Sequence, residues 1–139
     1  PVNPFFFQTD RRKGMMYVGL AGPLMNLALA YLGAVVLHAF VRFDYGGYWL
    51  ISFVQVFVFF NVILAVFNLI PIPPLDGSRV LAGLVPREGT AFIYQLENYG
   101  MFILLLLIVT GILWRILGPL VNLTLSIIIN LGGLAFIFF

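Results

Sequence analysis

The sequence contains no cysteine and few charged residues. Without cysteine, the chain can form neither a disulfide nor a thiolate metal site. Charged residues make up 9% of the 139 residues, and the formal net charge is +2. A charge this small, divided among several segments, does not favour a nucleic-acid partner. Hydrophobic residues make up 63% of the chain. A lipid bilayer is therefore the predicted environment.

Charged residues are absent from four stretches of the chain, and each stretch can be a membrane span. About 20 apolar residues are enough to cross a bilayer core. We predict an all-α fold, a polytopic integral membrane helical bundle with about four transmembrane helices in a single domain. The predicted spans are residues 15–40, 48–70, 99–117 and 120–139, with a loop at 71–98. The last two spans could instead form one broken hairpin, because little room for a loop remains around Gly118-Pro119.

The distribution of basic residues predicts the orientation of these spans. Seven basic residues divide five to two between the two sides: Arg11, Arg12, Lys13, Arg79 and Arg87 on one side, and Arg42 and Arg115 on the other. The positive-inside rule places the side with five in the cytoplasm. Both termini and the loop at 71–98 are then predicted to be cytoplasmic.

One acidic residue, Asp76, stands where an apolar stretch is interrupted by three prolines. A carboxylate at the end of a membrane segment is expensive and by default indicates a functional site. The alternative is a structural role. The sequence Asp-Gly-Ser-Arg-Val-Leu is typical of a helix N-cap that opens a short amphipathic helix to about Leu84. Residue types alone leave both interpretations open.

Small residues follow one face of the first span: Gly19, Gly22, Asn26, Ala30 and Gly33 are spaced 3, 4, 4 and 3 apart. Such a face lets neighbouring helices approach closely in lipid. Asn26 is its one strongly polar member. Either Asn26 hydrogen-bonds within a packing interface, or it presents an amide to substrate in a cavity.

Two further asparagines, Asn61 and Asn68, lie seven residues apart in the second span and share a helix face. Their amides could hydrogen-bond across helices. Asn68 stands where that span ends, so it could also orient the loop that leads to Asp76.

Three segments resemble the site-2 proteases, which are intramembrane zinc metalloproteases. Residues 61–81, NVILAVFNLIPIPPLDGSRVL, are similar to the C-terminal signature of that family. Residues 14–30, GMMYVGLAGPLMNLALA, resemble its second conserved stretch, whose Gly-x-x-x-Asn pattern is matched by Gly22 and Asn26. The opening PVNPFFFQTDRRKG resembles the segment that joins the catalytic helix to that stretch in small bacterial members. The likeness covers nearly the whole chain in order.

The resemblance implies hydrolysis of membrane-embedded peptides or proteins, and the expected location is a bacterial plasma membrane. The distribution of basic residues places the loop of Asp76 near its cytoplasmic side. Asp76 matches the third protein ligand of a catalytic Zn²⁺. Asn26 matches a position that faces substrate and can help to stabilise the oxyanion. Asn68 matches the asparagine that supports the Asp76 loop.

The sequence departs from the family pattern at one essential point, because it contains no His-Glu-x-x-His motif. That motif supplies the other two zinc ligands and the general base. The only histidine, His38, is predicted to mark the membrane interface, and Glu88 and Glu97 are predicted to lie in a solvated loop. One carboxylate cannot hold a catalytic zinc.

Two explanations fit the missing motif. The expected one is that the chain is the C-terminal part of a longer protease and is catalytically silent alone, since the resemblance begins inside a conserved linker. The other is a degenerate, non-catalytic protein, either a pseudoprotease that binds helices or a small transport-like bundle. A transporter would be expected to show paired intramembrane charges or sequence repeats, and the sequence shows neither.

Overall fold

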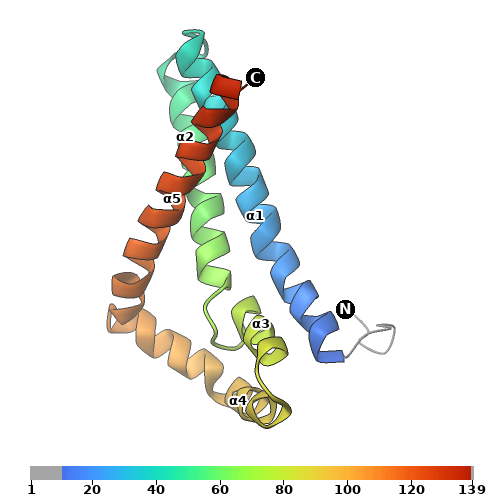
Figure 1. The fold of residues 1–139 in the computed structure, drawn as a ribbon. Helices are drawn as coiled ribbons and strands as arrows, with labels where there is room; N and C mark the ends of the chain where they lie inside the picture. The colour runs from blue at the N-terminus through green and yellow to red at the C-terminus, as the bar shows by residue number, and fades with distance from the viewer. Residues whose placement is uncertain (1–10, 139) are drawn as a thin grey trace. The chain divides into compact units, whose positions relative to one another are not determined.

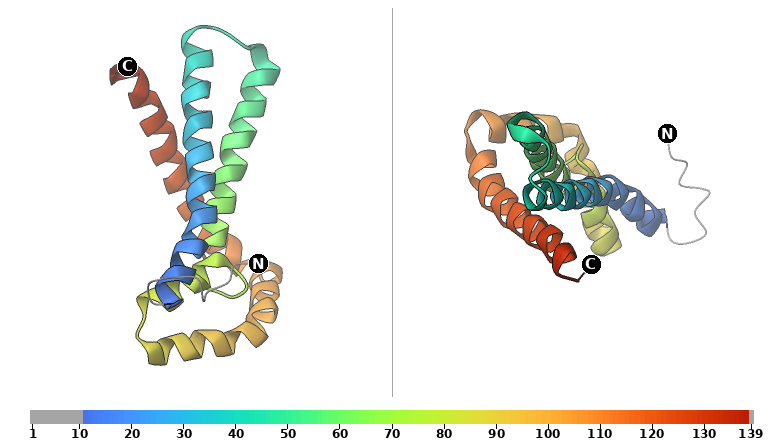
Figure 2. Two further views of the ribbon diagram at one scale, coloured as in Figure 1. Left: turned by 90° about the vertical axis from the view of Figure 1, so that its right-hand side faces the viewer. Right: turned by 90° about the horizontal axis from the view of Figure 1, so that it is seen from above.

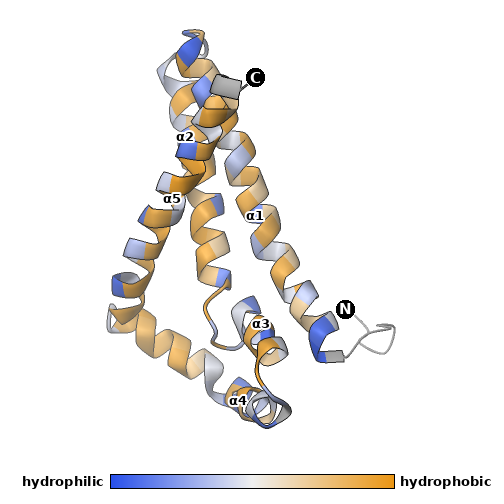
Figure 3. Ribbon diagram, viewed as in Figure 1, coloured by the Kyte–Doolittle hydropathy of each residue, from blue (hydrophilic) through white to orange (hydrophobic). Residues whose placement is uncertain are grey.

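The computed structural model describes residues 11–138, and every regular element in that range is an α-helix (Figure 1). In chain order the helices are α1 (Arg11–Arg42), α2 (Gly47–Asn68), α3 (Asp76–Leu84), α4 (Arg87–Val109) and α5 (Ile112–Phe138). The prediction of an all-helical membrane bundle is confirmed. Apart from α3, each helix is long and apolar enough to cross a bilayer. Figure 3 shows the apolar colouring that runs along these long helices.

The described residues form two compact units, which we describe separately. The first unit contains residues 11–23 and 67–116, and therefore the start of α1, the loop after α2, α3, α4 and the start of α5. The second unit contains residues 24–66 and 117–138. It holds the remainder of α1, nearly all of α2 and most of α5.

The core of the second unit is built from small and β-branched side chains. Its buried members are Ala30, Ala34, Val54, Val58, Val62, Val121 and Ile128. Within this unit α1 and α2 run in opposite directions, joined by a short connection (Figure 2). A Cβ on Gly33 would lie 2.7 Å from Cγ2 of Val58, and one on Gly132 would lie 2.8 Å from Cβ of Ala34. Close helix packing along this part of the small-residue face is confirmed.

Asn61 is buried on α2, but its amide does not reach another helix as the sequence predicted. Its Nδ2 donates to the carbonyl oxygen of Phe57 in α2 itself, at 2.9 Å. The prediction was wrong because a carbonyl one turn earlier in the same helix satisfies the amide. Asn68 is the last residue of α2 and belongs to the first unit.

The break between the last two long helices lies at Thr110 and Gly111, and not at Gly118-Pro119 as predicted. Gly111 has φ of +77°, the left-handed conformation that ends many helices and that glycine adopts without a steric penalty. Its N–H donates to the carbonyl of Ile108 at 3.2 Å. Pro119 lies inside α5, which is tolerated in membrane helices. The alternative that the last two spans form one broken hairpin stays a prediction.

Helix α4 begins at Arg87, twelve residues before the predicted start of the third span at Tyr99. The predicted loop at 71–98 therefore contains α3 and the first half of α4. An uncharged stretch of sequence predicts the apolar part of a helix, but it does not predict the polar residues by which the helix extends beyond that part. Where each helix enters and leaves the bilayer stays a prediction.

Glycine allows α4 to pack directly against the loop that precedes α3. Gly100 is buried, and a Cβ there would collide with the backbone carbonyl of Pro73. We expect Gly100→Ala to lower the free energy of unfolding by about 1–3 kcal/mol, because the backbone must move to admit the methyl group. Thermal unfolding of the detergent-solubilised protein measures the effect.

The control for that variant is Gly118→Ala, in the interior of α5, where a Cβ would have no described atom within 4 Å. It should lower the midpoint of unfolding less than Gly100→Ala does. Alanine is the better helix former, and only crowding against the ring of Pro119 opposes it. Equal destabilisation by both variants would show that the contact at Gly100 is not responsible.

Candidate functional site

Asp76 is the first residue of α3, and its side chain does not cap the helix. The N-cap position is Leu75, and no side-chain hydrogen bond caps the helix there. The short helix predicted to end at about Leu84 is confirmed, but the assignment of Asp76 as its N-cap is wrong. The carboxylate instead occupies the first turn, where the helix dipole stabilises a negative charge. Its side chain is 31% exposed.

The start of α3 packs on the glycine face of α1. A Cβ added to Gly19 would lie 3.0 Å from the backbone oxygen of Asp76 and 3.1 Å from Cβ of Arg79. One turn further along α1, a Cβ on Gly22 would lie 3.3 Å from Oδ2 of Asp76. The two glycines therefore bring α1 against both the backbone and the carboxylate of Asp76.

The loop between α2 and α3 holds Asp76 from the other side. Gly77 is buried, and a Cβ there would collide with the carbonyl oxygens of Leu69 and Ile70. The hydroxyl of Ser78 donates to the carbonyl oxygen of Leu75 at 2.7 Å and fixes the same turn. Only glycine fits after Asp76 in this arrangement, which explains the Asp-Gly pair in physical terms.

Arg79 is the charged neighbour of Asp76. Its Nη1 lies 3.7 Å from Oδ1 of the carboxylate, three residues earlier on the same helix. Both side chains are partly exposed, and such pairs contribute less than about 1 kcal/mol. Arg79 therefore balances the charge of Asp76 without determining its position.

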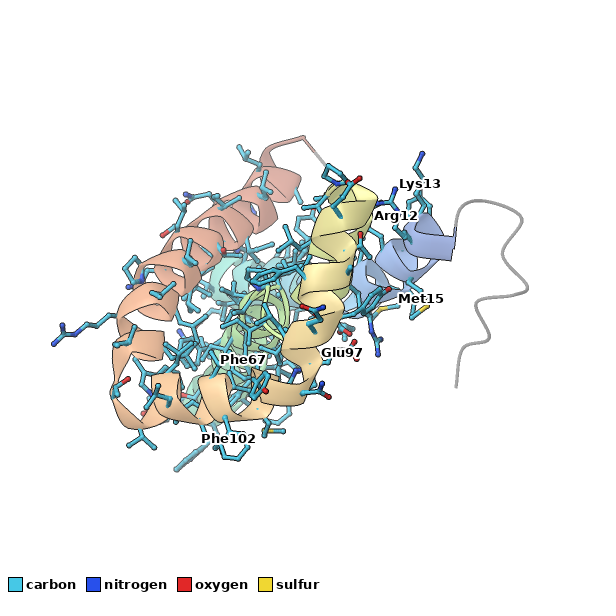
Figure 4. The ribbon with its side chains drawn as sticks, turned by 90° about the horizontal axis from the view of Figure 1, so that it is seen from below. Arg12, Lys13, Met15, Phe67, Glu97 and Phe102 are labelled. Atoms are coloured by element: carbon cyan, nitrogen blue, oxygen red, sulfur yellow. The ribbon has the colours of Figure 1, made fainter. Side chains whose placement is uncertain are left out.

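Arg12 secures the other end of α3, a role that the sequence analysis missed. Its Nη1 donates to the carbonyl oxygen of Val85 at 2.6 Å and to Oγ1 of Thr90 at 3.3 Å. The hydroxyl of Thr90 also donates to the carbonyl oxygen of Ala82 at 2.9 Å. Figure 4 shows Arg12 beside the segment that joins α3 to α4. Arg12 lies 73 residues from Val85 in sequence, so the residues around either position could not predict this contact.

A cavity of about 320 Å³ lies next to Arg79 in the first unit, lined by Pro73, Pro74, Ser78, Arg79 and Glu97. Glu97 belongs to α4, where Figure 4 labels it. The sequence placed Glu97 in a solvated loop; the residue is exposed, but it lies on a helix at the wall of a cavity. The other glutamate of α4, Glu88, is exposed in the first turn of the helix and does not line this cavity.

The structure places the other predicted residues as follows. Asn26 is half-buried on α1, four residues after Gly22, and belongs to the second unit. Nδ1 of His38 lies 2.8 Å from the carbonyl oxygen of Ala34 in the same helix. Of the opening segment that resembles the family linker, residues 1–10 lie outside the described part of the chain.

The carboxylate of Asp76 can supply one oxygen ligand to a metal ion. Among residues 11–138, no group of three His, Cys, Asp or Glu side chains is arranged to hold a metal. The described residues therefore form one side of a metal site at most.

Comparison with known proteins gives a consistent result. The family model described as Peptidase family M50 matches residues 44–111. The putative zinc metalloprotease YwhC of Bacillus subtilis is 38% identical over 130 residues, which are 88% of this chain and 58% of that protein. The putative zinc metalloprotease Rip2 of Mycolicibacterium smegmatis is 33% identical over 109 residues, 78% of this chain and 40% of that protein.

The chain thus spans little more than half the length of YwhC and less than half that of Rip2. No solved structure matches it. The matched family segment includes α2, the loop, α3 and α4, and so contains Asn68, Asp76 and Glu97. Together with the four apolar helices, these similarities show that the chain belongs to peptidase family M50, the site-2 protease family of membrane-embedded metalloproteases.

Proposed function

We propose that this chain is the C-terminal part of an intramembrane zinc metalloprotease that hydrolyses peptide bonds within the membrane. The observation that carries the proposal is the position of Asp76. Its carboxylate is held at the start of α3 between the glycine face of α1 and the loop after α2. Membership of a metalloprotease family supports the assignment of this carboxylate as a zinc ligand.

The two missing histidine ligands and the general-base glutamate would come from a helix outside this sequence. Two histidines and one carboxylate leave a coordination position open for water. Bound zinc lowers the pKa of such a water and polarises the carbonyl that is attacked. The contribution of this chain is to hold Asp76 in place and keep its loop unwound, which at membrane depth requires surrounding protein or a wet cavity.

Two asparagines are proposed to assist. Residues four apart share a helix face, so Asn26 carries an amide on the α1 face to which Gly22 belongs. We assign to Asn26 a contact with the substrate near the oxyanion. Asn68, at the end of α2, supports the loop that leads to Asp76.

The proposed membrane is the bacterial plasma membrane, with α3 and both termini on the cytoplasmic side. Arg12, Lys13 and Arg79 then face the cytoplasm, and Arg42 and Arg115 lie at the opposite ends of their helices. This orientation satisfies the positive-inside rule. Proteolysis would therefore take place close to the cytoplasmic surface.

The first test replaces the ligand itself. Asp76→Asn in the full-length protein should lower the cleavage rate of membrane-spanning reporter peptides by at least about 10²-fold, because a neutral amide is a poor zinc ligand. The matched control is Asp44→Asn in the connection between α1 and α2, where Asp44 is exposed with φ of +50° and asparagine adopts that conformation readily. Undiminished cleavage by Asp76→Asn, in a protein that inserts and folds normally, would exclude the ligand assignment.

A second test separates this proposal from the non-catalytic alternative. Metal analysis of the full-length protein should find one zinc per chain, whereas the purified 139-residue chain should contain no stoichiometric zinc. A pseudoprotease or a transport-like bundle would contain none in either form. Tight one-to-one zinc in the 139-residue chain would contradict our view that most of the ligands lie outside it.

A third test concerns Asn26. If its amide donates to the developing oxyanion, Asn26→Ala should lower kcat by about 10²–10³-fold with little change in KM. The control is Asn61→Ala, since that amide bonds within its own helix and should leave kcat within a few-fold of wild type. Unchanged kcat and KM for Asn26→Ala would restrict Asn26 to helix packing.

A further inference from the structure

Glu97 is an exposed residue of α4 that lies in line with the packing face of this helix. Ile93 and Leu104, four residues before and seven residues after it, are both 7% exposed. Gly100, three residues after it, is pressed against the carbonyl of Pro73. These spacings put all four residues on one side of the helix. Glu97 therefore lies beside the loop of Pro73, and both residues line the same cavity.

The cavity beside Glu97 has charged groups of both signs on otherwise apolar walls. The rings of Pro73 and Pro74 form the apolar part of the lining. The hydroxyl of Ser78 is engaged by the carbonyl of Leu75. Arg79 therefore provides hydrogen-bond donors, and Glu97 provides acceptors. With a volume of about 320 Å³, the cavity is at the small end of ligand pockets in proteins.

A pocket with one donor group and one acceptor group selects against simple ions. An anion such as a phosphate would be repelled by Glu97, and an isolated cation would be repelled by Arg79. A neutral group that both donates and accepts suits the pair. An unwound peptide is such a group, because every residue except proline carries one N–H and one C=O.

The position of the cavity links it to the proposed active site. Arg79 lines the cavity and also lies 3.7 Å from the carboxylate of Asp76. A peptide bond can be cleaved only if the substrate helix opens locally, and the freed backbone groups are costly at membrane depth unless they find partners. We infer that this cavity is a subsite for the unwound backbone next to the scissile bond. Glu97 accepts a backbone N–H, and Arg79 donates to a backbone carbonyl.

This inference rests on the proposed function for the identity of the ligand, but its test does not require catalysis. The full-length protein carrying Asp76→Asn is placed in lipid nanodiscs, and binding of two labelled synthetic peptides is titrated by fluorescence. Each peptide has about 20 leucines. One is interrupted at its centre by Gly-Pro, which favours unwinding, and the other is uninterrupted.

We expect the interrupted peptide to bind more tightly than the uninterrupted one. Adding Glu97→Leu should weaken binding of the interrupted peptide by about fivefold, the loss expected for one hydrogen bond, and leave the other peptide unaffected. Glu97→Gln, which keeps an acceptor oxygen, should retain the affinity. Glu88→Leu, on the same helix but outside the cavity, should have no effect.

Equal affinities of the Glu97→Leu and Glu88→Leu proteins for the interrupted peptide would overturn the assignment, as would equal losses in Glu97→Leu and Glu97→Gln. Such a result together with reporter cleavage by the protein that retains Asp76 would leave the protease proposal intact. Conversely, binding that depends on Glu97 without any cleavage would keep the subsite and refute the protease.

Discussion

The contact of α3 with neighbouring backbone is the constraint on which the candidate site depends. Gly77 packs against the carbonyl oxygens of Leu69 and Ile70, and Gly19 packs against the backbone oxygen of Asp76. Interiors this closely packed resist displacement, so the position of the carboxylate is set by shape. The partly exposed ion pair with Arg79 is too weak to set it. In lipid, where helices gain little from burying apolar surface against one another, small residues are the means by which such contacts form.

The same constraint explains why the sequence predicted α3 well. Prolines before Asp76 exclude a continuous helix, and the apolar spacing after it favours a new one. The helix observed at Asp76–Leu84 ends where predicted. Its first residue differs in role only, because Leu75 takes the N-cap position and leaves the carboxylate of Asp76 available. Local residue types therefore account for the backbone of the site and its most important side chain.

Other features could not be predicted because they depend on distant partners or on competing local signals. Gly118-Pro119 is a stronger breaker by composition than Thr110-Gly111, yet α5 accommodates Pro119 and the chain turns at Gly111. The charged residues before Tyr99 predicted a loop there, but α4 begins at Arg87, because a helix can extend beyond its apolar part. The contact of Arg12 with Val85 joins segments that no local window contains. The place of Glu97 at the wall of a cavity depends on the packing of α4 against the loop at Gly100.

The electrostatics of the site also depend on tertiary structure, because the guanidinium that pairs with Asp76 lines the same cavity as Glu97. Arg79 lies beside Asp76 and lines the cavity that Glu97 also lines. With both carboxylates ionised, these three side chains carry one net negative charge. The remaining charge disfavours anionic lipid headgroups, whereas a neutral peptide backbone leaves the balance unchanged. A metal ligand and a peptide subsite can therefore share one small region of the first unit.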